Sequence, residues 1–174
     1  MRLAGMLDES IVDGPGVRFV VFAQGCLHHC PGCHNPATWD VDGGEEYSVK
    51  EVLKRLKKRK KFIHGLTLSG GEPFLQAKEM AELARAARGL ELSVVTYTGY
   101  LYEDLLTTGL PGAADLLAVT DFLIDGPFIA ALKDITLPFR GSANQCIIDL
   151  TEQRTCGVTY QIEQVPMEGP VALA

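Results

Sequence analysis

Three cysteines that lie close together are the residues of this chain best suited to chemistry. Cys26, Cys30 and Cys33 have the spacing C-x3-C-x2-C, and no fourth cysteine lies nearby. In a cubane iron–sulfur cluster each of the four irons normally takes one thiolate. Three thiolates leave one iron without a protein ligand, and that iron can bind a small molecule through nitrogen and oxygen donors. The spacing therefore predicts a [4Fe–4S] cluster that is held by these three cysteines and has one open iron.

Zinc is an alternative occupant of the same loop, because His28, His29 and His34 lie beside the cysteines and zinc binds both residue types. A structural zinc site usually draws on a second ligand pair further along the chain, but Cys146 and Cys156 are single. A disulfide framework is disfavoured, because five cysteines are an odd number in a chain without a secretory signature. A zinc site and simple redox or inert thiols stay open as alternatives.

A second motif, at residues 66–73, reads Leu-Thr-Leu-Ser-Gly-Gly-Glu-Pro and begins with a short predicted strand. Glycine and proline at a strand end form a tight turn, and Gly70 and Gly71 let the backbone approach a ligand closely. An ordinary strand-to-helix turn explains these residues when they are taken alone. Because the cysteine loop follows the preceding strand, however, we expect the two motifs to line one mouth of the fold.

Strands and helices alternate along the chain. Strands are predicted at 17–22, 66–69, 92–96, 122–125 and 146–150, and helices after a capping box at 48–51 and at 76–88, 101–108 and 113–119. Nearly continuous apolar strands are typical of a parallel sheet that is covered on both faces. The chain is shorter than the ~250 residues of a full eightfold barrel. We therefore predict an α/β fold, an incomplete TIM-like barrel of parallel strands with outer helices.

Composition indicates a globular protein. The 174 residues, of which 47% are hydrophobic, suit one domain over residues 1–174, with a core at about 8–150 and an unassigned tail at 151–174. The net charge of −6 argues against nonspecific binding of nucleic acid. No apolar run approaches the ~20 residues that span a bilayer, and residues 1–10 do not read as a signal peptide. We expect a cytoplasmic protein without a nucleic-acid or membrane partner.

The cysteine spacing, together with Gly-Gly-Glu-Pro after the next strand, resembles the radical S-adenosylmethionine (SAM) enzymes. This resemblance implies that Cys26, Cys30 and Cys33 bind the cluster and that its open iron chelates the amino and carboxylate groups of SAM. It also implies that an electron from the cluster splits the sulfonium and produces a 5′-deoxyadenosyl radical. The cofactors then carry the hard chemistry, so no catalytic acid or base is predicted.

The same resemblance implies which residues contact SAM. They are Gly70, Gly71 and Glu72 for the methionine end, and Gly32, Cys33 and His34 for the adenine. Thr96, Thr98 and Asp125 follow or end later strands and are further candidates for ribose or methionine contacts.

Other segments resemble the glycyl-radical-enzyme activases. The start of the chain does so at 13–18 and 24–26, and the segments 96–100, 125–128 and 140–145 resemble the activases of anaerobic ribonucleotide reductase. The resemblance covers roughly residues 8–150. It implies that the radical removes an α-hydrogen from a glycine in the glycyl-radical subunit of that reductase. A flavodoxin- or ferredoxin-type protein is the expected electron donor.

Some features leave the target open. His34 and Asn35 after the third cysteine are closer to pyruvate formate-lyase activating enzyme, although that enzyme is longer than this chain. A radical SAM enzyme that acts on a small molecule is a second alternative, and a nonenzymatic zinc or iron–sulfur protein in binding or electron transfer is a third. The basic run at 54–61 is interpreted as the solvated end of a helix, with a docking patch for an acidic electron donor as the alternative.

Overall fold

The computed structural model describes residues 1–151 and 160–161. The strands are β1 (Arg2–Ser10), β2 (Arg18–Ala23), β3 (Glu45–Glu46), β4 (Gly65–Gly70), β5 (Ser93–Tyr97), β6 (Phe122–Asp125), β7 (Cys146–Asp149) and β8 (Tyr160–Gln161). The α-helices are α1 (Val49–Arg59), α2 (Ala77–Arg88), α3 (Tyr102–Thr107) and α4 (Ala113–Val119). The remainder of the predicted tail, including Cys156, lies outside the described residues.

The strands form a single open sheet in the order β3-β1-β2-β4-β5-β6-β7-β8. The four central strands, β2, β4, β5 and β6, are parallel, as predicted. The flanking strands differ from the prediction, because β1 and β3 on one side and β7 and β8 on the other pair antiparallel. The structure is therefore an α/β fold with a mixed sheet that does not close on itself.

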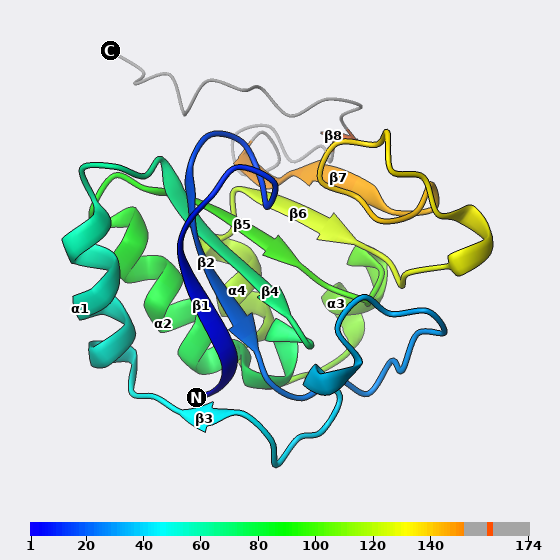
Figure 1. Cartoon of the computed structure of the whole chain (residues 1–174), viewed down its shortest axis with the longest axis horizontal. Helices are drawn as coiled ribbons and strands as arrows, with labels where there is room; N and C mark the ends of the chain where they lie inside the picture. Colours follow the sequence, from blue (N-terminus) through cyan, green and yellow to red (C-terminus); the bar gives the residue numbers. More distant parts are fainter. Residues whose placement is uncertain (152–159, 162–174) are drawn as a thin grey trace.

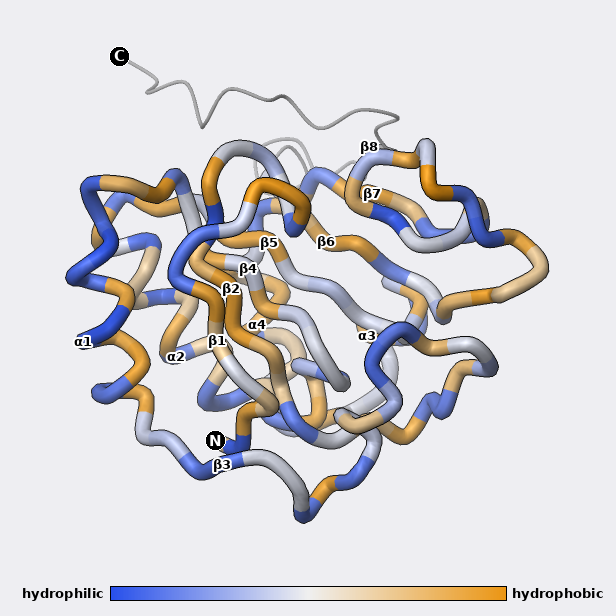
Figure 2. Tube along the Cα trace, in the orientation of Figure 1, coloured by the Kyte–Doolittle hydropathy of each residue, from blue (hydrophilic) through white to orange (hydrophobic). Residues whose placement is uncertain are grey.

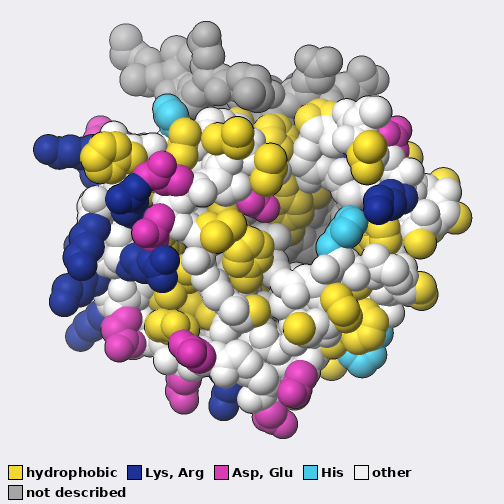
Figure 3. Space-filling model, viewed as in Figure 1, with side chains coloured by type: hydrophobic (Ala, Val, Ile, Leu, Met, Phe, Trp, Pro, Cys, Tyr) yellow, Lys and Arg dark blue, Asp and Glu magenta, His cyan; other side chains and the backbone are white. Residues whose placement is uncertain are grey.

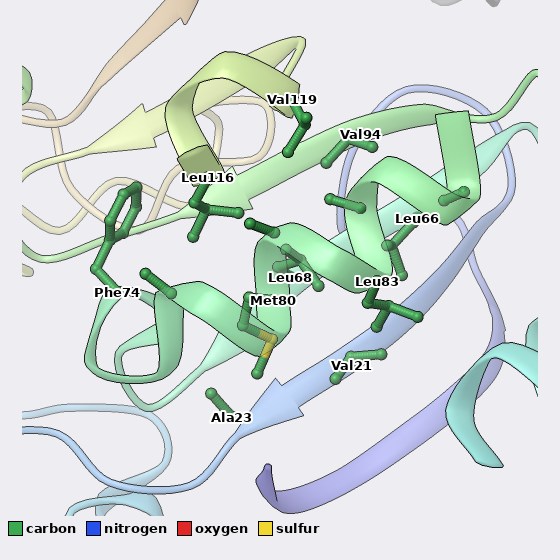
Figure 4. Close-up of a cluster of buried hydrophobic side chains, with 14 of the residues drawn as sticks. Val21, Ala23, Leu66, Leu68, Phe74, Met80, Leu83, Val94, Leu116 and Val119 are labelled. Atoms are coloured by element: carbon green, nitrogen blue, oxygen red, sulfur yellow. The ribbon is translucent and has the colours of Figure 1, made fainter. Parts of the chain in front are cut away.

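The helices cover one face of this sheet (Figure 1). The main core lies between that face and α2, where Met80 and Leu83 pack with Val21 and Leu68 of the central strands (Figure 4). The hydropathy colours follow this arrangement, with apolar colour along β2 and alternating colours along α1 (Figure 2). On the central strands the side chains that alternate with these core residues point to the opposite face, which the loops after β1 and β6 partly cover.

A local sequence signal explains where α1 begins. The capping box that begins α1 is present, because the Ser48 hydroxyl accepts from the Glu51 N–H and the Glu51 carboxylate accepts from the Ser48 N–H. The helix predicted at 76–88 is confirmed as α2, and a 3-10 turn, Pro73–Gln76, leads into it. Strand β1 was not predicted, because only Leu3 of its nine residues is buried and no regular apolar alternation marks it.

Arg18 is the exception in the apolar β2 and is fully buried on the face opposite the helices. Its guanidinium donates to the Ser93 hydroxyl at 2.6 Å, the Leu66 carbonyl at 2.6 Å and the Thr67 hydroxyl at 3.1 Å. Burial lowers the pKa of this guanidinium to about 10. The Thr67 hydroxyl in turn donates to the Asp13 carbonyl at 2.8 Å. Arg18 therefore ties the loop after β1 to strands β4 and β5.

The basic run of α1 lies away from the cysteine loop. The C-terminus of α1 leads into the amino end of β4, whereas the cysteine loop follows the carboxyl end of the adjacent β2. Arg55 pairs with Asp8 and Arg59 pairs with Glu9 of β1, and the cationic side chains line one side of the molecule (Figure 3). This placement favours the solvated helix end over a docking patch. Within the described residues no helix is long and apolar enough to cross a membrane.

Candidate functional site: a cysteine-lined cavity

A cavity of about 330 Å³ opens at the carboxyl ends of the parallel strands, on the face that the helices leave free (Figure 3). The loops after four strands contribute to its walls: Cys26, His28, Cys30, Cys33 and His34 after β2, Gly70 and Gly71 at the end of β4, Thr98 and Gly99 after β5, and Gly126 and Phe128 after β6. Because parallel strands present their carboxyl ends at one edge, motifs far apart in the chain meet here. The cysteine loop and the Gly-Gly turn therefore share one cavity.

The three cysteine thiols of the loop differ in their surroundings. Cys26 is buried, and this burial raises the pKa of its thiol, although the N–H groups of His28 and His29 act against the shift. Cys30 and Cys33 are half-buried. The Cys33 N–H donates to the Cys30 carbonyl at 3.0 Å, and the Asn35 N–H donates to the Cys33 Sγ at 3.4 Å. The loop is thus folded tightly around its second and third cysteines.

This donor set fits a cluster better than a single ion. Among the described residues no three His, Cys, Asp or Glu side chains come together as ligands of one metal ion. A tetrahedral zinc site needs four ligands around one point. A cubane distributes its thiolates over separate irons, one thiolate to each. Three thiols that line one cavity suit the cubane. Metal binding would displace the proton that burial favours on Cys26.

The Gly-Gly turn packs directly against the start of the cysteine loop. Gly70 has φ +93°, a conformation that favours glycine. A Cβ atom on Gly71 would collide with the carbonyl oxygen of Gly25, the residue before Cys26. Two backbone bonds of 2.8 Å join these segments, from the Gly71 N–H to the Ala23 carbonyl and from the Glu72 N–H to the Gly25 carbonyl. A side chain at Gly71 would therefore disturb the cysteine loop as well as the turn.

Glu72 lies behind the cavity wall, with its side chain fully buried. One carboxylate oxygen accepts from the Phe74 N–H at 3.0 Å, and the other accepts from the Gly99 N–H at 2.8 Å. The Thr98 hydroxyl lies 3.0 and 3.1 Å from the two oxygens, and the His28 ring nitrogen Nε2 lies 2.9 Å from the second. A buried carboxylate is stable when donors surround it in this way. Glu72 joins the loops after β2, β4 and β5.

The sequence-predicted site residues separate into two groups. Those that line the cavity are Cys26, Cys30, Cys33, His34, Gly70, Gly71 and Thr98, and those that do not are Gly32, Glu72, Thr96 and Asp125. The Thr96 hydroxyl is buried against the Thr120 hydroxyl at 2.8 Å. The Asp125 carboxylate accepts from the Tyr102 N–H at 2.8 Å at the start of α3. Both serve local structure.

Asp13 and Tyr97 line the cavity and were not predicted as site residues. The Ser10 hydroxyl donates to the Asp13 carboxylate at 2.5 Å. Burial, and then the charge of Asp13, raise the pKa of the Tyr97 hydroxyl well above its usual value, so Tyr97 stays a neutral phenol. Ser93, Val95 and Tyr97 of β5 share one face and Thr96 lies on the other, but both faces of β5 are covered, so the sequence carried no signal for which face lines the cavity.

A family model described as a 4Fe-4S single cluster domain matches residues 12–148. The chain is also 32% identical, over 145 residues, to the anaerobic ribonucleoside-triphosphate reductase-activating protein of Escherichia coli K12, a match that covers 79% of this chain and 91% of that protein. The protein of the same name from Enterobacteria phage T4 is 38% identical over 141 residues, which cover 77% of this chain and 85% of the phage protein.

Pyruvate formate-lyase-activating enzyme of Clostridium pasteurianum is similar over a shorter stretch. The two chains are 38% identical over 114 residues, which cover 60% of this chain and 48% of that enzyme. The matches to the reductase-activating proteins extend over nearly the whole of those relatives, whereas this match leaves half of the enzyme without a counterpart.

Proposed function

We infer the function of this chain from its family, since it belongs to the anaerobic ribonucleoside-triphosphate reductase-activating proteins and its residues 12–148 match a 4Fe-4S single cluster domain. These are glycyl-radical-enzyme activases of the radical SAM type, and their cofactors are a [4Fe–4S] cluster and SAM. We propose that this chain installs a glycyl radical on an anaerobic ribonucleotide reductase. The observation that carries the proposal is the meeting of three thiols and a Gly-Gly turn in one cavity.

Each part of the cavity would have a distinct role. Cys26, Cys30 and Cys33 would supply the three thiolates of the cluster, which when bound supplies an electron for cleavage of the SAM sulfonium. Gly70 and Gly71 would admit the methionine end of SAM close to the backbone.

Three further residues, Gly32, Cys33 and His34, would lie beside the adenine. Phe128 supports this part of the loop, because its ring centroid lies 5.1 Å from that of His34. Glu72 would act from behind the wall, as the residue that holds the Gly-Gly turn. Thr98 lines the cavity and donates to Glu72, so it is the best placed of the later candidates for a SAM contact.

The architecture also suits a protein substrate. We assign the sheet to an incomplete TIM-like barrel in which residues 1–174 act as one domain, the parallel strands β2, β4, β5 and β6 forming its central part. The cavity stays open at the carboxyl ends of these strands, so a loop of the partner enzyme has access to it. The partner would be the glycyl-radical subunit of the reductase. A flavodoxin- or ferredoxin-type donor would supply the electron in the cytoplasm.

The proposal predicts which partner receives the radical. We expect the reduced protein and SAM to produce a glycyl doublet in the electron paramagnetic resonance spectrum of the reductase. The doublet should disappear when the radical-site glycine of the reductase is replaced by alanine. Pyruvate formate-lyase is the matched alternative partner, because His34 and Asn35 resemble its activase. A doublet on pyruvate formate-lyase with none on the reductase would refute the proposed target.

A further inference from the structure

His28 is held in one orientation between the cysteine loop and the loop after β5. It lies two residues after Cys26, yet its ring nitrogen Nε2 reaches the Glu72 carboxylate at 2.9 Å. The ring centroid lies 4.5 Å from that of Tyr100 in an edge-to-face arrangement. Because a carboxylate only accepts hydrogen bonds, the Nε2–H of His28 is the donor.

Gly99 provides the space that this orientation needs. A Cβ atom on Gly99 would lie 2.5 Å from Cδ2 and 2.7 Å from Nε2 of the His28 ring. The Gly99 N–H donates to the same carboxylate oxygen that His28 contacts. The ring therefore fills the position of the missing side chain, and both residues converge on one oxygen of Glu72.

His28 provides the side-chain bond from the cysteine loop to this buried carboxylate. Glu72 follows Gly71 directly, and its carboxylate also holds Thr98 of the cavity wall. A shift of the cysteine loop relative to the Gly-Gly turn would break the bond between His28 and Glu72. The bond thus links the position of three cluster thiols to the position of the turn.

We propose that His28 is a positioning residue that holds the cysteine loop in register with the Gly-Gly turn, so that SAM meets the open iron and the turn simultaneously. The inference rests on the proposed function, because it assumes that SAM contacts both parts. A ligand with two points of attachment binds tightly when those points are fixed before it arrives. Without the hydrogen bond between His28 and Glu72, part of the binding free energy of SAM is spent on ordering the cysteine loop.

The test compares the same substitution at two adjacent histidines. In His28→Asn the side chain is too short to reach Glu72. His29→Asn is the matched control, because His29 is exposed, packs its ring on Trp39 and has a φ of +48° that asparagine tolerates. His28→Gln restores a donor of similar reach. The readouts are iron and sulfide content, the melting temperature of the cluster-free protein, and the Kd of SAM. The Kd is measured from the SAM-dependent change in the spectrum of the reduced cluster.

We expect His28→Asn to keep its cluster content, to melt at a somewhat lower temperature because the buried Glu72 carboxylate loses one donor, and to bind SAM about tenfold more weakly, which is the effect of one hydrogen bond to a charged group. His28→Gln should recover part of the affinity, and His29→Asn should match the wild type. An unchanged Kd in His28→Asn, or an equal change in His29→Asn, overturns the inference. Wild-type protein that takes up no cluster or binds no SAM contradicts the proposed function instead.

A double variant separates positioning from a direct contact between His28 and SAM. If His28 acts through Glu72, the loss of affinity in His28→Asn should be smaller in a Glu72→Gln background, where only a neutral amide oxygen is left to accept the bond from His28. Interacting residues show such non-additivity, whereas independent residues do not. If the two substitutions instead weaken SAM binding by independent factors that multiply in the double variant, His28 acts without Glu72 and the inference is overturned.

Discussion

Alanine at Cys26, Cys30 or Cys33 should reduce the cluster iron and sulfide of the purified protein at least tenfold. Each thiolate binds one iron, and the described cavity holds no further cysteine that is able to replace a lost ligand. Iron and sulfide analysis after anaerobic reconstitution measures the effect. We expect this to be the largest effect of any single substitution on the cofactor content.

Cys146→Ala is the matched control for the cysteine variants. Cys146 is a half-buried thiol in β7 and does not line the cavity. It should keep the full cluster content. Full content in all three loop variants, or loss in Cys146→Ala, would place the cluster elsewhere.

Glu72→Ala should lower the free energy of unfolding of the cluster-free protein by about 2–4 kcal/mol. The substitution leaves the N–H groups of Phe74 and Gly99, the Thr98 hydroxyl and the His28 ring nitrogen without their common acceptor. The Phe74 N–H is buried, so water does not readily replace the carboxylate there. Urea unfolding under reducing conditions measures the loss.

Glu82→Ala is the matched control, because it removes a carboxylate that does not join any loops. Glu82 is exposed on α2, and such surface substitutions usually change stability by less than about 0.5 kcal/mol. If Glu72→Ala is as stable as Glu82→Ala, Glu72 is not the residue that joins the three loops.

Local signals in the sequence were sufficient to predict the shared cavity. The spacing of Cys26, Cys30 and Cys33 indicates a cluster that is ligated by three thiolates. Gly70 and Gly71 end a short apolar strand. Both motifs follow strands that were predicted to be parallel and that are consecutive along the chain. The geometry of parallel strands then brings them together, so this part of the site required no knowledge of long-range contacts.

Side-chain direction was harder to predict than position. Thr96 and Tyr97 are neighbours at the end of β5, but Tyr97 lines the cavity and Thr96 packs on the helix side. Successive residues of a strand point to opposite faces. Strands that are covered on both faces carry apolar residues throughout, so the pattern of β5 did not mark which face belonged to the site.

The role of Glu72 depended on contacts between distant residues. Its partners His28 and Gly99 lie 44 and 27 positions away along the chain. No local spacing rule relates residues at such separations. The sequence therefore predicted that Glu72 belongs to the site but not that its carboxylate faces the interior and joins three loops. The antiparallel pairing of β7 was missed for a similar reason, because pairing direction depends on the path of the preceding loop.

The most direct measurement of the central claim follows one hydrogen atom from the partner to the cofactor product. The reductase is prepared with deuterium on the α-carbon of its radical-site glycine and is incubated with the reduced protein and SAM. If this chain is the activase, 5′-deoxyadenosine should carry one deuterium for each glycyl radical formed. Formation of 5′-deoxyadenosine without deuterium, while no glycyl radical appears, would contradict the account, because SAM would then be cleaved without any hydrogen transfer from the partner.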